Sequence, residues 1–147
     1  MSAEIEPQEI VMSPYGAFMG IALDSFGAGE AACSIALQEQ HYNAGGRVHG
    51  GVLMSLADTV AGVAVRSLRP EGAASATTDL NISFIRPPMG DRLEAKAAVL
   101  HQGKRLYRVE ISVFCSDTKT SAEAKLVARC NATFMIVFPE ASATQSA

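Results

Sequence analysis

Apolar and polar residues alternate along most of this chain, and one longer apolar segment interrupts the alternation. A period of two is typical of half-buried strands, and it predicts six of them. The expected strands are residues 18–23, 31–37, 77–84, 93–99, 107–115 and 124–136. Residues 24–29, between the first two strands, have the composition of a turn.

The longer apolar segment, residues 52–65, predicts a helix with hardly any polar face. Such a helix lies in a protein core or in a membrane, and this one is shorter than the roughly 20 apolar residues that a bilayer requires. We therefore expect a core helix that begins at Gly50-Gly51 and ends near Pro70, because proline cannot continue a helix. Gly62 in its interior costs about 1 kcal/mol relative to alanine, and we expect close packing against a sheet as the reason.

Two strands, one buried helix and four more strands predict an α+β fold, in which a curved antiparallel sheet of about six strands wraps around one long central helix. One sheet cannot cover a helix that is apolar on all sides, and the other sheet face also needs cover, so we expect a dimer. The length suits a single domain over residues 1–147. Residues 1–15 form an N-terminal segment with a short helical turn at 10–12, and residues 139–147 are expected to be disordered.

Composition and charge limit the classes of function. The net charge of -3 leaves no nucleic-acid footprint, so an anionic ligand must be held by local basic residues and backbone amides. Three widely spaced cysteines fit neither a zinc pattern nor a disulfide framework, and we expect buried free thiols in a reducing cytoplasm. The acidic N-terminus does not resemble a signal peptide, and no segment suits a membrane.

Asp58 stands in the middle of the apolar helix. Aspartate is rarely buried unless it is paired or used in chemistry. A carboxylate withdrawn from water is a stronger base, so Asp58 is a candidate general base or nucleophile. The other interpretation is structural, with Asp58 paired to an arginine or capping a neighbouring loop.

The start of the helix is a second candidate for chemistry, because Gly50 and Gly51 directly follow His49. The first N–H groups of a helix lack internal partners and carry partial positive charge, so they can stabilise an oxyanion. The glycines are equally explained by a tight junction between loop and helix. His49 is a candidate proton shuttle, second oxyanion donor or structural group. Asn43 is a candidate for orienting an attacking water or a carbonyl group, and the other interpretation is that it caps its own loop.

The spacing Asn43-x5-His49-Gly50-Gly51-x6-Asp58, followed by residues 77–84 and by Arg86-Pro87, resembles the hotdog-fold acyl-CoA thioesterases. The similarity extends over most of the chain and is strongest to the phenylacetate-pathway (PaaI-like) branch, which is related to 4-hydroxybenzoyl-CoA thioesterases. The resemblance implies the same sheet-and-helix architecture. It also implies an acyl-CoA substrate and a homodimer or a homotetramer that is a dimer of dimers. We expect no separate cofactor, and no metal because the sequence contains no cluster of metal ligands.

The resemblance also implies roles for individual residues. The Gly50 amide, with His49, would polarise the thioester carbonyl, and Asp58 would act as general base or nucleophile. Asn43 and Thr77 would position the carbonyl or the water. Asn43, His49 and Gly50 would act from one subunit, and Asp58 and Thr77 from the other.

Several further residues are expected near the substrate. Gly51 lies beside the oxyanion donor, and Thr78 would replace Thr77 if the strand register slipped by one residue. Asp79 and Asn81 are expected on the same strand face as Thr77, facing solvent. The phosphates of CoA require cations, for which the candidates are Arg86, Arg105 with Lys104, and Arg47.

Two other functions remain open at this point. A hotdog enoyl-CoA hydratase or dehydratase also uses a histidine and a helix carboxylate, and it would consume crotonyl-CoA without releasing a thiol. A non-catalytic acyl-CoA-binding protein would bind the thioester and leave it intact. The acyl group itself cannot be read from these residues.

Overall fold

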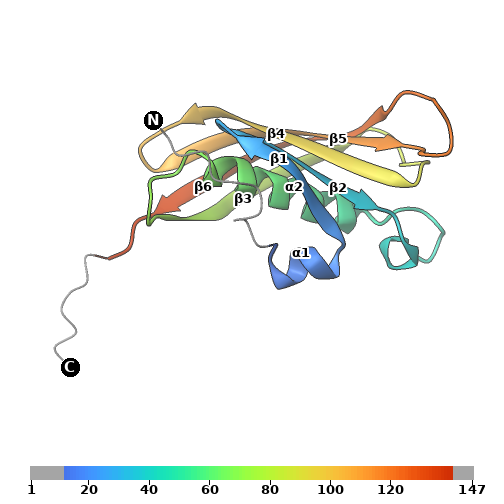
Figure 1. Cartoon of the computed structure of the whole chain (residues 1–147), viewed down its shortest axis with the longest axis horizontal. Coiled ribbons are helices and arrows are strands. Elements are labelled where there is room, and N and C mark those ends of the chain that lie inside the picture. Colours follow the sequence, from blue (N-terminus) through green and yellow to red (C-terminus); the bar gives the residue numbers. More distant parts are fainter. Residues whose placement is uncertain (1–11, 141–147) are drawn as a thin grey trace.

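The computed structural model describes residues 12–140, which form one six-stranded antiparallel sheet around one long helix (Figure 1). The strands lie in the order β1-β2-β4-β5-β6-β3, so β1 and β3 are the two edges. This arrangement confirms the predicted α+β hotdog architecture. In chain order the elements are α1 (Pro14–Phe18), β1 (Ile21–Gly27), β2 (Glu30–Ala36), η2 (Glu39–His41), α2 (Gly50–Arg66), β3 (Ala74–Phe84), β4 (Arg92–Gln102), β5 (Leu106–Ser116) and β6 (Lys125–Val137).

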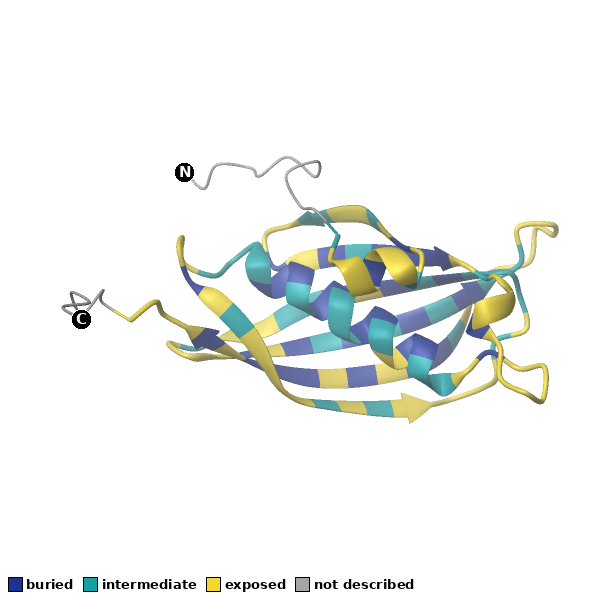
Figure 2. Ribbon diagram, turned by 90° about the horizontal axis from the view of Figure 1, so that it is seen from below, coloured by how far each residue is buried: buried dark blue, intermediate teal, exposed yellow. Residues whose placement is uncertain are grey.

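Helix α2 packs its broad apolar face on the concave side of the sheet (Figure 2). Each fully buried leucine or valine there contributes about 1.5–3 kcal/mol relative to its exposed state. The helix is not apolar on every side, however. Residues spaced three or four apart form an outward stripe that is only half-buried or exposed, and its members are Gly51, Met54, Ser55, Asp58, Thr59, Gly62 and Arg66.

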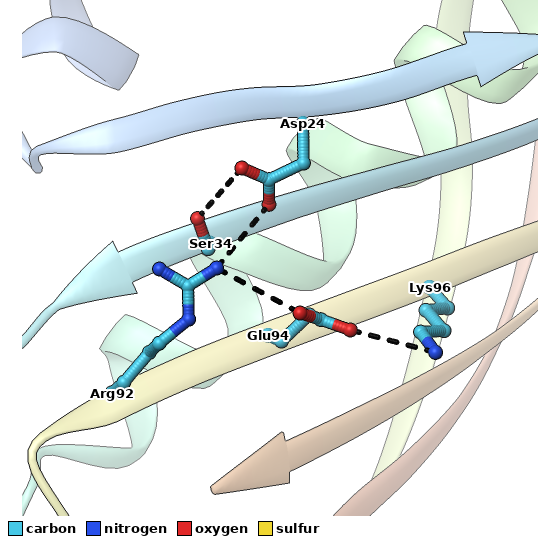
Figure 3. Close-up of polar contacts among 5 residues, drawn as sticks. All are labelled: Asp24, Ser34, Arg92, Glu94 and Lys96. Carbon is cyan, nitrogen blue, oxygen red and sulfur yellow. Dashed lines mark hydrogen bonds and ion pairs between the residues drawn. The ribbon is translucent and has the colours of Figure 1, made fainter. Parts of the chain in front are cut away.

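The convex face of the sheet carries charges instead of a second apolar layer. Across β1, β2 and β4, Arg92 lies 3.8 Å from Asp24 and 3.7 Å from Glu94, and Lys96 lies 3.5 Å from Glu94 (Figure 3). Ser34 also donates a hydrogen bond to Asp24. Exposed ion pairs contribute little stability, but they make this face compatible with water. The expectation that the convex face needs cover was therefore wrong here.

The first strand differs from its prediction. Residues 18–20 do not begin a strand, because Ser13 caps α1 with Pro14 at the first helical position, and α1 continues to Phe18. The predicted turn at 24–29 is mostly strand, since β1 extends to Gly27. A bulge between Leu23 and Ser25 interrupts the alternation, and this edge strand is polar enough to resemble a turn. The helical turn predicted at 10–12 falls largely outside the described residues, as does most of the predicted tail.

The three cysteines are free and buried, as predicted, at Cys33 on β2, Cys115 on β5 and Cys130 on β6. They lie on separate strands that face the core. Among the helices in residues 12–140, none is long and apolar enough to cross a membrane.

Candidate active site

The loop that precedes α2, residues 38–49, is fixed by one buried histidine. The His41 ring is completely buried. Its Nδ1 accepts a hydrogen bond from the Gln38 amide at 2.8 Å, so Nε2 carries the proton and donates to the Met19 carbonyl at 2.8 Å. The His41 carbonyl in turn accepts the His49 amide at 2.9 Å. The ring thus ties the loop to the junction between α1 and β1.

Replacing His41 by phenylalanine should lower the free energy of unfolding by about 2 kcal/mol, because the partly buried hydrogen bonds to the Gln38 amide and the Met19 carbonyl are lost while most of the ring volume is preserved. Urea unfolding monitored by circular dichroism measures this loss. The exposed His101 is a matched control, and His101→Phe should leave the midpoint unchanged. A His41→Phe midpoint equal to that of the control would mean that the ring does not hold the loop.

Asn43 caps its own loop, which is the structural interpretation of this residue. Its Oδ1 accepts hydrogen bonds from the amides of Gly45 at 3.0 Å and Arg47 at 3.1 Å. Its side-chain NH2 group takes no part in these bonds, so it remains a donor. The same side chain can therefore shape the loop and present a donor to a ligand.

His49 is the N-cap of α2. Its Nδ1 accepts the Gly51 amide at 2.8 Å, which leaves the proton of the neutral ring on Nε2. The Gly51 amide is thus already used, and it is not available to a substrate while the cap is intact. His49 itself is exposed and can offer its Nε2–H as a donor.

Gly50, by contrast, has a free amide. In the part of the chain that the structure describes, its N–H donates to no acceptor. Gly50 lines a cavity of about 370 Å³ together with Asn43, Phe84 and Arg86. A Cβ at this position would lie 3.2 Å from Cζ of Phe84, so glycine allows the ring to approach the start of the helix. The cavity therefore contains an unpaired helix N-terminal donor, the kind of group that stabilises an oxyanion.

Asp58 lies on the outward stripe of α2 and is half-buried, whereas the sequence predicted a buried carboxylate. Its Oδ1 accepts a hydrogen bond from Oγ1 of Thr77 at 2.7 Å. The expected burial was wrong for the single chain because the sheet covers this stripe only in part. The contact with β3 nevertheless fixes one carboxylate oxygen and leaves the other free.

The register of β3 decides between the two threonines. Thr77 pairs with Phe134 and Asp79 with Thr133, so a bulge at Thr78 shifts the strand by one residue. Thr77 then faces α2, while Thr78 donates to the Thr133 carbonyl at 3.0 Å. Asp79 is on the opposite face from Thr77, because antiparallel partners share a face and neighbouring residues alternate. The predicted common face of Thr77, Asp79 and Asn81 was therefore wrong, although both polar residues are exposed.

The predicted residues form two groups rather than one. Asn43, His49, Gly50 and Arg86 gather at the N-terminal end of α2, and Asp58 joins Thr77 farther along. Asp58 lies eight positions after Gly50 in α2, which corresponds to roughly 12 Å along the helix axis. A single chain therefore does not bring the donor and the carboxylate to one carbonyl group.

The candidate cations also separate. Arg86 and Arg47 line the cavity beside Gly50. Arg105 lies with Lys104 in the turn between β4 and β5, where they line a different hollow of about 490 Å³. A further hollow of about 530 Å³ lies on the convex face of the sheet and contains none of the candidate residues.

Two residues of this region were not identified from the sequence. His41 belongs to no motif, and its hydrogen-bond partner Met19 is distant in the sequence. Phe84 was read only as a strand residue, yet its ring packs on Gly50 although the side chain is 54% exposed. Neither the exposure of Phe84 nor its position beside Gly50 has a signal in the sequence, because both depend on how β3 lies next to α2.

Comparison with known proteins identifies what the chain resembles. A family model described as the thioesterase superfamily matches residues 45–122. The acyl-coenzyme A thioesterase PaaI of Escherichia coli is 36% identical over 105 residues, which cover 71% of this chain and 73% of that protein. Human acyl-coenzyme A thioesterase 13 is 32% identical over 110 residues, which cover 74% of each chain.

The fold agrees with these sequence matches. The solved structure of the E. coli PaaI protein from the phenylacetic acid degradation operon has a TM-score of 0.73 and 30% sequence identity to this chain. The similarity covers 85% of both chains.

Proposed function

Because the chain belongs to the thioesterase superfamily and is a PaaI-like thioester hydrolase, we propose that it cleaves acyl-CoA at a site built from two subunits. The products are the free acid and CoA. The observation that carries this proposal is the free amide of Gly50, a residue that lines a cavity but precedes Asp58 by roughly 12 Å along the helix axis.

One subunit supplies the electrophilic half of the site. The Gly50 N–H binds the thioester oxygen and stabilises the negative charge that develops on it. His49 can add its Nε2–H, and Asn43 its side-chain NH2 group, as further donors. Arg86 lies at the same cavity and is the candidate for holding a phosphate of CoA.

The other subunit supplies the carboxylate. As general base, Asp58 takes a proton from water while the water oxygen adds to the thioester carbon, and the proton then passes to the sulfur as the carbon–sulfur bond breaks. As nucleophile, Asp58 itself adds to the carbon, the carbon–sulfur bond breaks and CoA leaves as a thiolate that takes a proton from water. A second water then hydrolyses the mixed anhydride, which gives the free acid and regenerates the Asp58 carboxylate. Thr77 holds one oxygen of Asp58 in both cases.

A free sheet edge supports assembly of two copies. Strand β3 has eleven residues, forms one edge of the sheet and pairs only with β6 within the described chain. Long free edges offer unpaired backbone groups to another strand. Two β3 strands related by a two-fold axis would set the α2 helices antiparallel, so that Asp58 of each subunit approaches Gly50 of the other.

Mixed dimers test this arrangement. In a dimer of one Gly50→Pro subunit and one Asp58→Asn subunit, one site carries both changes and the other carries neither. We expect each parent protein to keep no more than about 1% of the wild-type thiol release. The doubly tagged mixed dimer should recover about half of it, as one intact site of two predicts. Absence of recovery in a confirmed mixed dimer would contradict a shared site.

A further inference from the structure

Two arginines at the end of α2 have no counter-ion among the described residues. Arg66 closes the helix, Arg69 follows it, and both are half-buried. No ion pair within residues 12–140 involves either one. The only side-chain hydrogen bond of this pair in that range runs from Nη1 of Arg69 to Oγ of Ser75, at 3.2 Å. A cation in the last helical turn is favoured by the helix dipole, but this accounts for Arg66 alone.

The second arginine is held at an electrostatic cost. Partial burial lowers the pKa of Arg69, and the positive charge of Arg66 lowers it further. Two like charges kept close together disfavour each other, and an anion bound between them would offset that repulsion. The fork-shaped guanidinium groups bind carboxylates and phosphates through paired hydrogen bonds.

The arginine pair is connected to the proposed site through the surface of α2. Asp58, Gly62 and Arg66 follow one another on the outward stripe at intervals of four residues, which places them in one row. A Cβ at Gly62 would meet only ring atoms of Phe134, at 3.7 and 4.0 Å, so packing against the sheet does not require glycine there. The predicted reason for Gly62 was therefore wrong, and the glycine instead leaves the row open between the carboxylate and the arginine.

Strand β3 also links the arginine pair to Asp58, because it contacts both. Ser75 and Thr77 are two residues apart, so both face α2. Ser75 accepts from Arg69, and Thr77 donates to Asp58. Resting on the proposed function, we propose that Arg66 and Arg69 bind a negatively charged group of the substrate, about two helical turns from Asp58. The anion is either a carboxylate at the far end of the acyl group or a phosphate of CoA.

Three thioesters distinguish these sources. Octanoyl-CoA has only the CoA phosphates, suberyl-CoA adds a terminal carboxylate to a chain of the same length, and the octanoyl thioester of N-acetylcysteamine has no anion. Arg66→Gln and Arg69→Gln are compared with Arg92→Gln, a control on the convex face. Arg69→Lys keeps the charge and should recover part of any loss.

If the arginines bind a terminal carboxylate, both Gln variants should lower kcat/KM for suberyl-CoA by roughly tenfold to a hundredfold. Their kcat/KM for octanoyl-CoA should then be unchanged. If they bind a phosphate of CoA, the Gln variants should lose kcat/KM equally for both CoA thioesters and lose none for the N-acetylcysteamine thioester. Equal losses on all three substrates, or none on any, would overturn the anion site. Titration of the thioesters into Asp58→Asn protein gives the same comparison as binding affinities, so the anion site can be judged even if the wild type hydrolyses none of them.

Discussion

Gly50→Pro is expected to lower kcat/KM by about 100- to 1000-fold, the usual effect of removing one oxyanion donor. Proline has no N–H, so the variant loses the group that we assign to the thioester oxygen. The fold should tolerate the change. Gly50 is the first residue of α2, where proline is favoured, and His49 before it is extended at φ -66° and ψ 134°, as a residue preceding proline must be.

Gly50→Ala is the matched control for this experiment. Both substitutions place a Cβ 3.2 Å from Cζ of Phe84, so both push on the same exposed ring. Only the proline also removes the amide proton. The difference in thiol release between two variants with the same circular dichroism spectrum therefore measures the donor. Equal activities would remove the Gly50 amide from the mechanism.

Asp58→Asn is expected to lower turnover by about 100- to 10,000-fold, as loss of a general base or nucleophile does. Asp58 is half-buried, and among the described residues only its Oδ1 accepts a hydrogen bond, so the amide should not destabilise the fold. Thr77 can still donate its hydroxyl to the amide oxygen, which keeps the side chain in place. Thiol release and urea unfolding are measured on the same preparation.

The informative control for this variant is Thr77→Val, which keeps Asp58 and removes its hydrogen-bond donor. A smaller loss than that of Asp58→Asn is expected, because the carboxylate keeps its chemistry and loses only its orientation. Near-normal turnover by folded Asp58→Asn would exclude the carboxylate from catalysis.

The sequence predicted the elements whose pattern comes from burial on one face. The long helix, its start at Gly50 and the alternation in β4, β5 and β6 all reflect contact with one core. Edge strands were predicted less well, because β1 and the first half of β3 are largely exposed and show no clear apolar alternation. The bulge at Thr78 was not predicted for the same reason. The register of β3 is defined by its pairing with β6, and an exposed stretch carries no apolar alternation that would specify it.

The site was predicted only in part because a motif gives spacing but not hydrogen bonds. The motif identified the helix N-terminal donor and the carboxylate. Because Gly50 and Asp58 lie on the same helix, their spacing also gives their separation along its axis. Which amide is free depends on His49, whose Nδ1 accepts the Gly51 amide and leaves that of Gly50 unpaired. Neither the half-exposure of Asp58 nor the role of His41 has a local signal.

The buried cysteines determine how clearly the activity can be followed. Burial, helped by the charge of Asp24, raises the pKa of Cys33 to about 12, and burial raises that of Cys130 to about 11. Thiol reagents attack the thiolate, so near pH 8 these side chains stay protonated and unreactive in the folded enzyme, and Cys115 is shielded by burial. A thiol-trapping dye should therefore record the CoA product with little background. A variant that unfolds during the assay should add an early signal of up to three thiols per chain, which separates loss of structure from loss of catalysis in one recording.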